Sequence, residues 1–184
     1  MTVTLKNIKK SYGDRIIFDN FNRGIVVDKP VVLMGESGVG KTTLARMIAG
    51  LEKPDFGEIT GVPEAVSFMF QEDRLLPWLS AKENVEYVSD KEAADYYLEK
   101  VLLGGEKDTP VADLSGGMKR RVALARALAY KSELVILDEP FKGLDFELKK
   151  KMTALISEEK RRFLIITHEE EDAALLGAKV INIQ

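Results

Sequence analysis

The eight residues from Gly35 to Thr42 restrict the fold of this chain more than any other feature of its sequence. They read Gly-Glu-Ser-Gly-Val-Gly-Lys-Thr and fit the pattern G-x-x-x-x-G-K-[ST]. The apolar run 31–34 precedes them, and apolar residues at helical spacing follow over 44–51. Glycines allow such a loop to wrap its backbone N–H groups around a phosphate, and the following helix adds the positive end of its dipole. The sequence therefore predicts a phosphate-binding loop between a strand and a helix.

Two side chains of this loop have specific expected tasks. We expect Lys41 to contact the β- and γ-phosphates of a nucleotide and Thr42 to be a ligand of Mg²⁺. The alternative is a flexible loop without a ligand, which the flanking strand and helix patterns disfavour. The expected nucleotide-binding residues of this segment are Gly35, Glu36, Ser37, Gly38, Val39, Gly40, Lys41, Thr42 and Thr43.

The rest of the chain predicts an α/β fold in a single domain. The runs 31–34, 134–137 and 163–166 are short and rich in Val, Ile and Leu, which is typical of parallel strands covered on both faces. Residues 2–27 alternate between apolar and polar and contain turn signals, so we expect an antiparallel β layer there. The segment at about 72–113 predicts a short helical subdomain, and the core would then consist of residues 1–71 and 114–184.

Composition and charge exclude several classes of protein. The chain has 27 Lys and Arg against 30 Asp and Glu, so it lacks the positive field that drives binding to nucleic acid. It has no Cys and one His, which excludes a disulfide framework, thiol catalysis and a multi-histidine metal site. Its apolar runs are far shorter than the ~20 residues that span a bilayer, and residues 1–6 do not resemble a secretory signal. We therefore expect a cytoplasmic protein.

Two carboxylates, Asp138 and Glu139, directly follow the predicted strand 134–137. The carboxyl end of a parallel strand lies at the same edge of the sheet as the phosphate loop, so Asp138 can hold Mg²⁺ and Glu139 can polarise a water molecule. Acids also end strands as ordinary solvated residues, and only the presence of Lys41 and Thr42 makes the catalytic interpretation the stronger one. The predicted reaction is phosphoryl transfer with water as the acceptor.

The segment 114–118, Leu-Ser-Gly-Gly-Met, resembles the signature motif of the ATP-binding cassette (ABC) ATPases. That family's other motifs follow in order from Tyr12 to His168. The resemblance implies ATP and Mg²⁺ as ligands, ATP hydrolysis coupled to transport, and a P-loop core with flanking helices and a helical insertion. Met118 stands where the family usually has Gln, and the interval from Gln71 to Ser115 is shorter than is usual.

The resemblance also implies roles for four further residues. Tyr12 resembles the aromatic residue on which adenine stacks, and Gln71 resembles the glutamine whose side-chain oxygen joins the Mg²⁺ shell. Asp145 resembles the aspartate of a loop that crosses the dimer interface, and His168 resembles the histidine that touches the γ-phosphate and the attacking water. The alternatives are a core tyrosine, a solvated glutamine, a simple turn and a structural histidine.

The signature residues Ser115, Gly116 and Gly117 precede a helical pattern, where backbone N–H groups form a ready anion site. In the family they close onto the γ-phosphate of a second copy. The resemblance therefore implies a head-to-tail dimer, which we expect to be a homodimer.

The segment Gln71–Leu79 and Met118 resemble the nitrate/sulfonate/taurine-type importer ATPases. This resemblance implies a membrane permease docked near Gln71–Leu79, a solute-binding protein in the full system, and a peripheral location on the cytoplasmic face of the membrane. Leu75, Leu76 and Trp78 could line a groove for a permease helix, or could form the small core of the insertion. A soluble ABC ATPase that drives an assembly partner remains the alternative function. Little sequence follows 180–183, so we expect no C-terminal regulatory domain.

Overall fold

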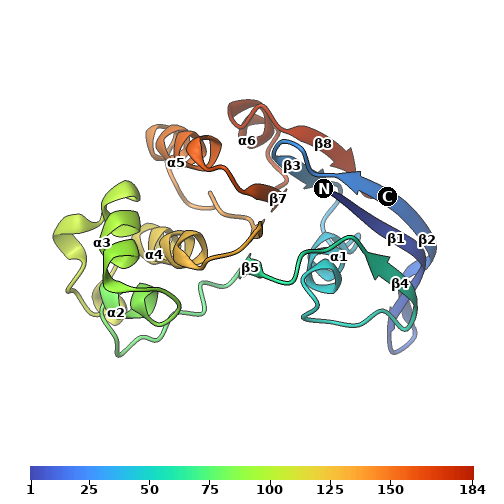
Figure 1. Cartoon of the computed structure of the whole chain (residues 1–184), viewed down its shortest axis with the longest axis horizontal. Helices are drawn as coiled ribbons and strands as arrows, with labels where there is room; N and C mark the ends of the chain where they lie inside the picture. Colours follow the sequence, from blue (N-terminus) through green and yellow to red (C-terminus); the bar gives the residue numbers. More distant parts are fainter.

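The parallel strands expected from the apolar runs are present at the centre of the molecule (Figure 1). The computed structural model describes the whole chain, residues 1–184. The central sheet has five strands, all parallel, in the order β5-β6-β7-β3-β8. They are β3 (Val31–Met34), β5 (Val66–Met69), β6 (Leu134–Asp138), β7 (Arg162–Ile166) and β8 (Lys179–Asn182). The loops that follow these strands therefore meet at one edge of the sheet, which is where ligands bind in open α/β folds.

A second sheet is antiparallel and has the strand order β2-β1-β4. Its strands are β1 (Thr2–Tyr12), β2 (Arg15–Val26) and β4 (Phe56–Thr60). The antiparallel layer expected over 2–27 is thus confirmed as the β1–β2 hairpin, in which Tyr12 pairs with Arg15 at the turn. Strand β4 lies outside the predicted strands because it is largely exposed and lacks a clear apolar pattern.

Six α-helices cover the parallel sheet or extend from it. They are α1 (Lys41–Ile48), α2 (Ala81–Glu86), α3 (Lys91–Lys100), α4 (Gly116–Ala129), α5 (Phe146–Glu158) and α6 (Glu170–Leu175). Short polar side chains start four of them, since Ser80, Asp90, Ser115 and Asp145 each accept a hydrogen bond from a backbone N–H of the first turn. None of the helices combines the length and the apolar character that crossing a membrane requires.

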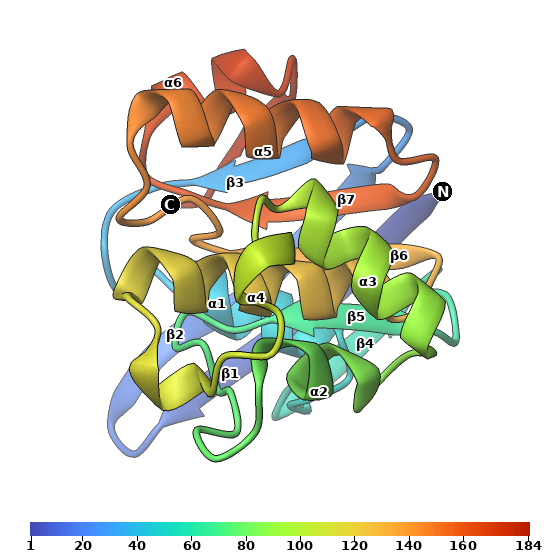
Figure 2. The same ribbon diagram turned by 90° about the vertical axis from the view of Figure 1, so that its left-hand side faces the viewer.

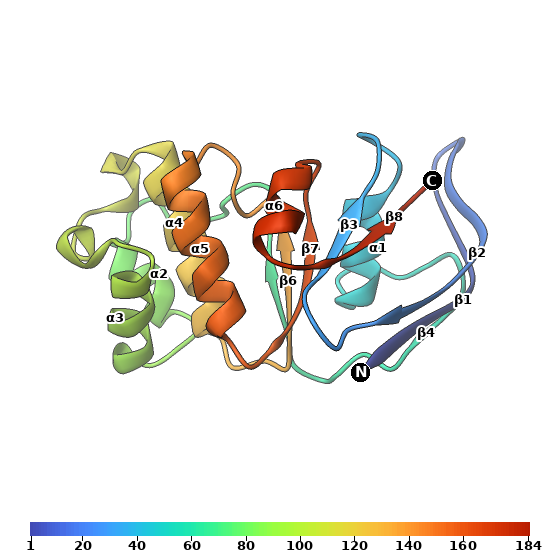
Figure 3. The same cartoon turned by 90° about the horizontal axis from the view of Figure 1, so that it is seen from above.

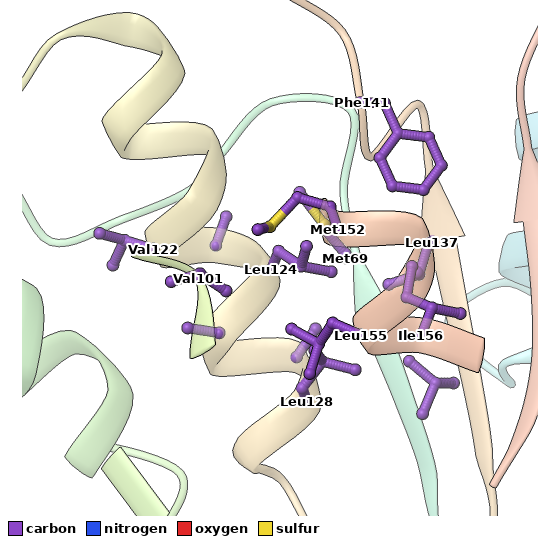
Figure 4. Close-up of a cluster of buried hydrophobic side chains, with 14 of the residues drawn as sticks. Met69, Val101, Val122, Leu124, Leu128, Leu137, Phe141, Met152, Leu155 and Ile156 are labelled. Atoms are coloured by element: carbon purple, nitrogen blue, oxygen red, sulfur yellow. The ribbon is translucent and has the colours of Figure 1, made fainter. Parts of the chain in front are cut away.

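The parallel sheet separates two hydrophobic clusters. Successive residues of β6 point to opposite faces, so Val135 and Leu137 belong to one cluster and Leu134 and Ile136 to the other. Helix α1 and the antiparallel sheet cover the second face, while α4 and α5 run side by side across the first (Figures 2 and 3). Figure 4 shows side chains of α4 and α5 meeting above β6, with Leu128 beside Leu155.

The helical segment α2–α3 packs on the outer side of α4 (Figure 3). Val85 of α2 and Leu98 of α3 are fully buried and belong to the same cluster as Leu124 of α4 and Val135 of β6. The segment is therefore joined to the sheet through α4 by a continuous apolar core. The division into a core of 1–71 and 114–184 and a helical subdomain at 72–113 stays a prediction.

Candidate nucleotide-binding site

The phosphate loop joins the end of β3 to the start of α1, as the sequence predicts. Gly35 has a φ of 145°, and a Cβ atom there would lie 2.4 Å from the carbonyl oxygen of Ile183. Gly40 has a φ of 108°, and its Cβ would lie 2.5 Å from a methyl carbon of Ile17. Both positions therefore require glycine, because a side chain would clash with backbone or with the packed hairpin.

Lys41 is the first residue of α1, and its side chain turns back into the loop. The Nζ atom donates hydrogen bonds to the carbonyl oxygens of Gly35, at 2.8 Å, and Glu36, at 2.9 Å. The residue is buried, so a positive charge is held inside the curve of the loop next to the N-terminal end of α1. This is a favourable place for a phosphate group.

A cavity of about 310 Å³ opens beside the loop. Its lining residues come from the β1–β2 hairpin and from the loop and α1, namely Tyr12, Arg15, Ile17, Gly38, Gly40, Lys41, Thr42 and Thr43. Tyr12 is 47% exposed and its hydroxyl donates to the Glu52 carboxylate at 2.5 Å. Burial and this hydrogen bond raise the pKa of Tyr12. The structure thus brings the predicted aromatic residue and the phosphate loop to one cavity, whose size suits a small ligand.

Arg15 is a residue of this cavity that the motifs did not indicate. Its guanidinium Nη2 donates to the carbonyl oxygen of Gly38 at 2.9 Å, and none of the carboxylates in the structure forms an ion pair with it. Its remaining donors are available to an anionic ligand. The sequence signal was the tight turn after Tyr12, which pairs Tyr12 with Arg15 and directs both side chains to the loop.

Asp138 ends β6 next to Thr42 at the start of α1. The Thr42 hydroxyl donates to Asp138 Oδ2 at 2.8 Å. Asp138 is buried, and this burial, followed by the nearby charge of Glu139, raises the pKa of its carboxyl group. A hydroxyl and a carboxylate are hard oxygen ligands, and Mg²⁺ typically uses one or two such protein groups together with substrate phosphates. The pair therefore fits Mg²⁺.

Glu139 and His168 come together at the ends of neighbouring strands. His168 Nδ1 lies 2.9 Å from Glu139 Oε1, and the exposed fractions of the two side chains are 61% and 14%. The hydrogen bond and the charge of Glu139 raise the pKa of His168. Glu139 has a φ of 52°, a left-handed conformation that is uncommon for a non-glycine residue and costs backbone energy.

Gln71 lies just after β5, at the same edge of the sheet, but its exposed side chain contacts neither Thr42 nor Asp138. Its carbonyl oxygen accepts a hydrogen bond from Arg120, a buried residue of α4 that the sequence did not indicate. Arg120 also donates to the carbonyl oxygens of Asp138 and Glu139. One guanidinium therefore fixes the backbone around Gln71 and the two acids. In the sequence, an arginine in a helix pattern cannot be distinguished from a solvated arginine. Its contacts with the strand ends are visible only in the tertiary structure.

The signature residues lie away from the phosphate-loop cavity, which none of them lines. Ser115 is exposed and caps α4, with its hydroxyl accepting from the N–H of Met118 at 3.3 Å. Asp145 is exposed and caps α5 in the same way. The two loops are neighbours, because a Cβ at Gly117 would lie 3.8 Å from the carbonyl oxygen of Gly143. One chain therefore assembles two separate groups of predicted site residues.

A phosphate loop between β3 and α1, with acids at the end of β6 in the same parallel sheet, defines a P-loop nucleotide-binding protein. The family model described as "ABC transporter" matches residues 18–142. The chain belongs to the ABC transporter family.

Aliphatic sulfonates import ATP-binding proteins are among the curated relatives of the chain. The chain is 43% identical over 162 residues to the aliphatic sulfonates import ATP-binding protein SsuB 3 of Paraburkholderia xenovorans, covering 86% of this chain and 65% of that protein. It is 39% identical over 195 residues to SsuB 1 of Burkholderia cenocepacia, covering 99% of this chain and 61% of that protein. The chain thus spans less than two thirds of the length of these relatives.

Among solved structures, the chain is similar to a dimeric, post-hydrolysis state of the ATP-binding cassette MJ0796 bound to ADP and Pi. The TM-score is 0.88 at 29% identity, and the match covers 99% of this chain and 94% of that one. A second dimeric structure of this bacterial ABC transporter cassette matches with a TM-score of 0.86. The α/β fold with a parallel core and an antiparallel layer, as the sequence predicts, is confirmed.

Proposed function

We propose that this chain binds and hydrolyses ATP as the energy subunit of an ABC importer. The observation that carries the proposal is the arrangement at one sheet edge. There, Lys41 turns into the phosphate loop, Thr42 bonds to Asp138, and Glu139 is in contact with His168. A phosphate-binding cation, two metal ligands and a general base are therefore present at one edge of the sheet.

The cavity residues fit the parts of ATP in order. Tyr12 is exposed enough to stack on the adenine, while the N–H groups of the loop and the cations Lys41 and Arg15 face the phosphates. Thr42 and Asp138 would hold Mg²⁺, with Gln71 as a further ligand after its side chain turns inward. Bound there, Mg²⁺ would neutralise charge on the β- and γ-phosphates.

Glu139 is the general base of the proposed reaction. Its carboxylate accepts a proton from a water molecule as the water oxygen attacks the γ-phosphorus and the bond to the leaving oxygen of ADP breaks. His168 holds this carboxylate through Nδ1 and keeps its other ring nitrogen for the γ-phosphate. Lys41 stabilises the charge that develops on the phosphate oxygens.

The second half of the site would come from another copy of the chain. Ser115, Gly116 and Asp145 are exposed, and Gly117 lies next to the loop of Asp145. None of these residues lines the cavity of its own phosphate loop. The dimeric form of the similar MJ0796 structures supports a head-to-tail homodimer, in which each signature helix faces the other copy's phosphate loop.

A permease partner is supported by an apolar cavity of about 250 Å³ beside the edge strand β5. It is lined mainly by apolar side chains, including Leu51, Phe68, Phe70, Val88 and Tyr130, which would accept an amphipathic helix. The expectation that Leu75, Leu76 and Trp78 line a groove for the permease stays a prediction, and none of the three lines this cavity. Leu75 packs against the main core, which is compatible with the alternative that these residues form the core of the insertion.

Trp78 is 73% exposed on the segment Gln71–Leu79, so its side chain is available to a permease. Docking there would place the chain on the cytoplasmic face of the membrane. The names of the SsuB relatives support an import function. We propose a small solute as the cargo and a solute-binding protein as the third component.

The test is MgATP hydrolysis by the wild-type chain and by Glu139→Gln. The substitution keeps the shape of the side chain and removes the base, so we expect turnover to fall by ~10²–10⁴-fold while ATP still binds. Glu133→Gln is the matched control, because Glu133 is an exposed carboxylate at the opposite end of β6. Equal hydrolysis by all three proteins would rule out the proposed base.

A further inference from the structure

Lys149 of α5 is a charged residue inside the molecule, with only 8% of its side chain exposed. Its Nζ atom forms ion pairs with Glu169, with Asp172 Oδ1 at 3.4 Å and with Glu171 Oε2 at 3.9 Å. Although burial opposes its charged form, the Glu169 and Asp172 contacts raise the pKa of Lys149. A buried cation of this kind is retained only where several partners compensate its desolvation.

The partners of Lys149 belong to the segment that carries His168. Asp172 is buried, and its Oδ2 atom accepts a hydrogen bond from the Thr167 hydroxyl at 2.7 Å. The Thr167 hydroxyl in turn accepts from the N–H of Glu169 at 3.1 Å. The residues immediately before and after His168 are therefore tied into one network, and Lys149 is its only cation.

The other end of Lys149 is attached to the loop of Asp145. The N–H of Lys149 donates to the carbonyl oxygen of Asp145 at 2.9 Å, within the first turn of α5. Asp145 caps this helix and follows Gly143, which is next to Gly117. The helix turn from Asp145 to Lys149 thus connects the loop beside the signature residues with the segment of His168.

We propose that Lys149 is a positioning residue that holds the backbone of Thr167–Glu169 so that His168 stays in contact with Glu139. Through the first turn of α5, it also makes that contact depend on the placement of the Asp145 loop. The proposal rests on the proposed ATPase function for its effect on turnover, but the His168–Glu139 contact can be observed without ATP.

His168 is the only histidine of the chain, so its ring signals in an NMR spectrum need no assignment. The groups that face it are Glu139, Glu169 and Asp172, and all three carboxylates raise its pKa. If Lys149 acts through position, Lys149→Met releases His168 from Glu139, and the pKa of His168 falls toward its ordinary value of about 6.5. If Lys149 acts only through charge, its removal leaves the carboxylates uncompensated, and the pKa of His168 rises.

The expected NMR result is a lower His168 pKa in Lys149→Met than in the wild type, with the wild-type value restored in Lys149→Arg. A higher or unchanged pKa in Lys149→Met would overturn the proposal. Thr167→Val removes the hydroxyl that links Asp172 to the N–H of Glu169 while keeping the side-chain shape. It must shift the pKa in the same direction, and it tests the network without removing the buried cation.

In hydrolysis assays we expect kcat of Lys149→Met to fall by ~10–100-fold, because a small displacement of a catalytic group has effects of this size. The KM for ATP should change less than about 3-fold, since no cavity residue contacts Lys149. Lys150→Met is the matched control, because Lys150 is half-exposed on the same helix and pairs only with Glu147.

A fall in kcat without rescue by Lys149→Arg would contradict the positioning role. Absence of ATP hydrolysis in the wild type would contradict the proposed function alone, and the NMR titration would still decide the role of Lys149.

Discussion

The two groups of predicted site residues differ in how much of the task a single chain completes. Around the phosphate loop, the side chains point inward, so that Lys41 and Arg15 bond to loop carbonyls and Thr42 bonds to Asp138. In the second group, Ser115 and Asp145 are exposed and use their side chains to cap their own helices. The first group is assembled within one chain, whereas the second would be completed by another copy in the proposed dimer.

The strongest test of this difference is the solution mass of Glu139→Gln, measured by light scattering. Blocking turnover should trap ATP between two copies, because ligand that binds only the closed dimer stabilises it by mass action. We expect the mass of the variant to double with MgATP and to stay monomeric with MgADP. A variant that binds ATP but remains monomeric would contradict the proposal that the group around Ser115 and Asp145 binds the ATP of a second copy.

A substitution at Ser115 distinguishes the two groups of residues, because it should affect turnover and leave ATP affinity unchanged. Ser115→Asp keeps an effective helix cap, since Asp and Ser cap equally well, but places a negative charge where the partner's γ-phosphate would dock. Loss of one preorganised donor typically lowers kcat by ~10²–10³-fold, and repulsion adds to this. ATP affinity, measured by calorimetry, should stay within about 2-fold of wild type, since Ser115 does not line the cavity.

Ser80→Asp makes the same exchange at the cap of α2 and serves as the control, with unchanged kcat expected. If Ser115→Asp weakened ATP binding as much as turnover, the two groups of residues would not be separate halves.

Arg15 tests whether the group around the phosphate loop binds the phosphates of ATP. If its guanidinium makes a charge-assisted contact to a phosphate, we expect Arg15→Gln to weaken ATP binding by ~10-fold. Adenosine, which lacks phosphates, should bind equally to both proteins, and Arg15→Lys should give an intermediate ATP affinity. Arg23→Gln, at the exposed end of the same hairpin, is the control. Equal weakening of adenosine and ATP would show that Arg15 supports the hairpin and does not contact phosphate.

The sequence predicted the residues whose position follows from the end of a strand. Asp138 and His168 lie at or just after the end of a short apolar run, and Lys41 lies at the end of the loop that follows such a run, so the parallel sheet brings them to one edge. Arg120 and Lys149 could not be predicted, because their partners are distant in the sequence, as in the Arg120–Gln71 and Lys149–Glu169 contacts. A pattern of residues on one helix does not distinguish such contacts from a solvated charge.

The lining residues of the apolar cavity beside β5 were not predicted for a different reason. Phe68 lies on the edge strand β5 and Phe70 directly follows it, whereas Val88 follows α2 and Tyr130 follows α4. Leu75, in the expected docking segment, is packed against the core and does not line this cavity. Local hydrophobicity along the chain therefore did not indicate the residues that line it.

The smallest expected effect concerns the His168–Glu139 pair, which forms within a single chain. Glu139 raises the pKa of His168 in the folded protein, so the pair increases the free energy of unfolding. This increase is fully present below the pKa of His168 in the unfolded chain, about 6.5, and is lost as the pH rises through the pKa in the folded protein. Because the imidazole is largely exposed, the gain over His168→Asn should be under about 1 kcal/mol.

Urea unfolding of the wild type and His168→Asn at pH 6 and pH 9 measures this gain directly. We expect the difference in unfolding free energy between the two proteins to shrink at the higher pH. A difference that grows with pH would contradict an ion pair within the single chain. The Glu139–His168 contact would then be expected only when a second copy is bound.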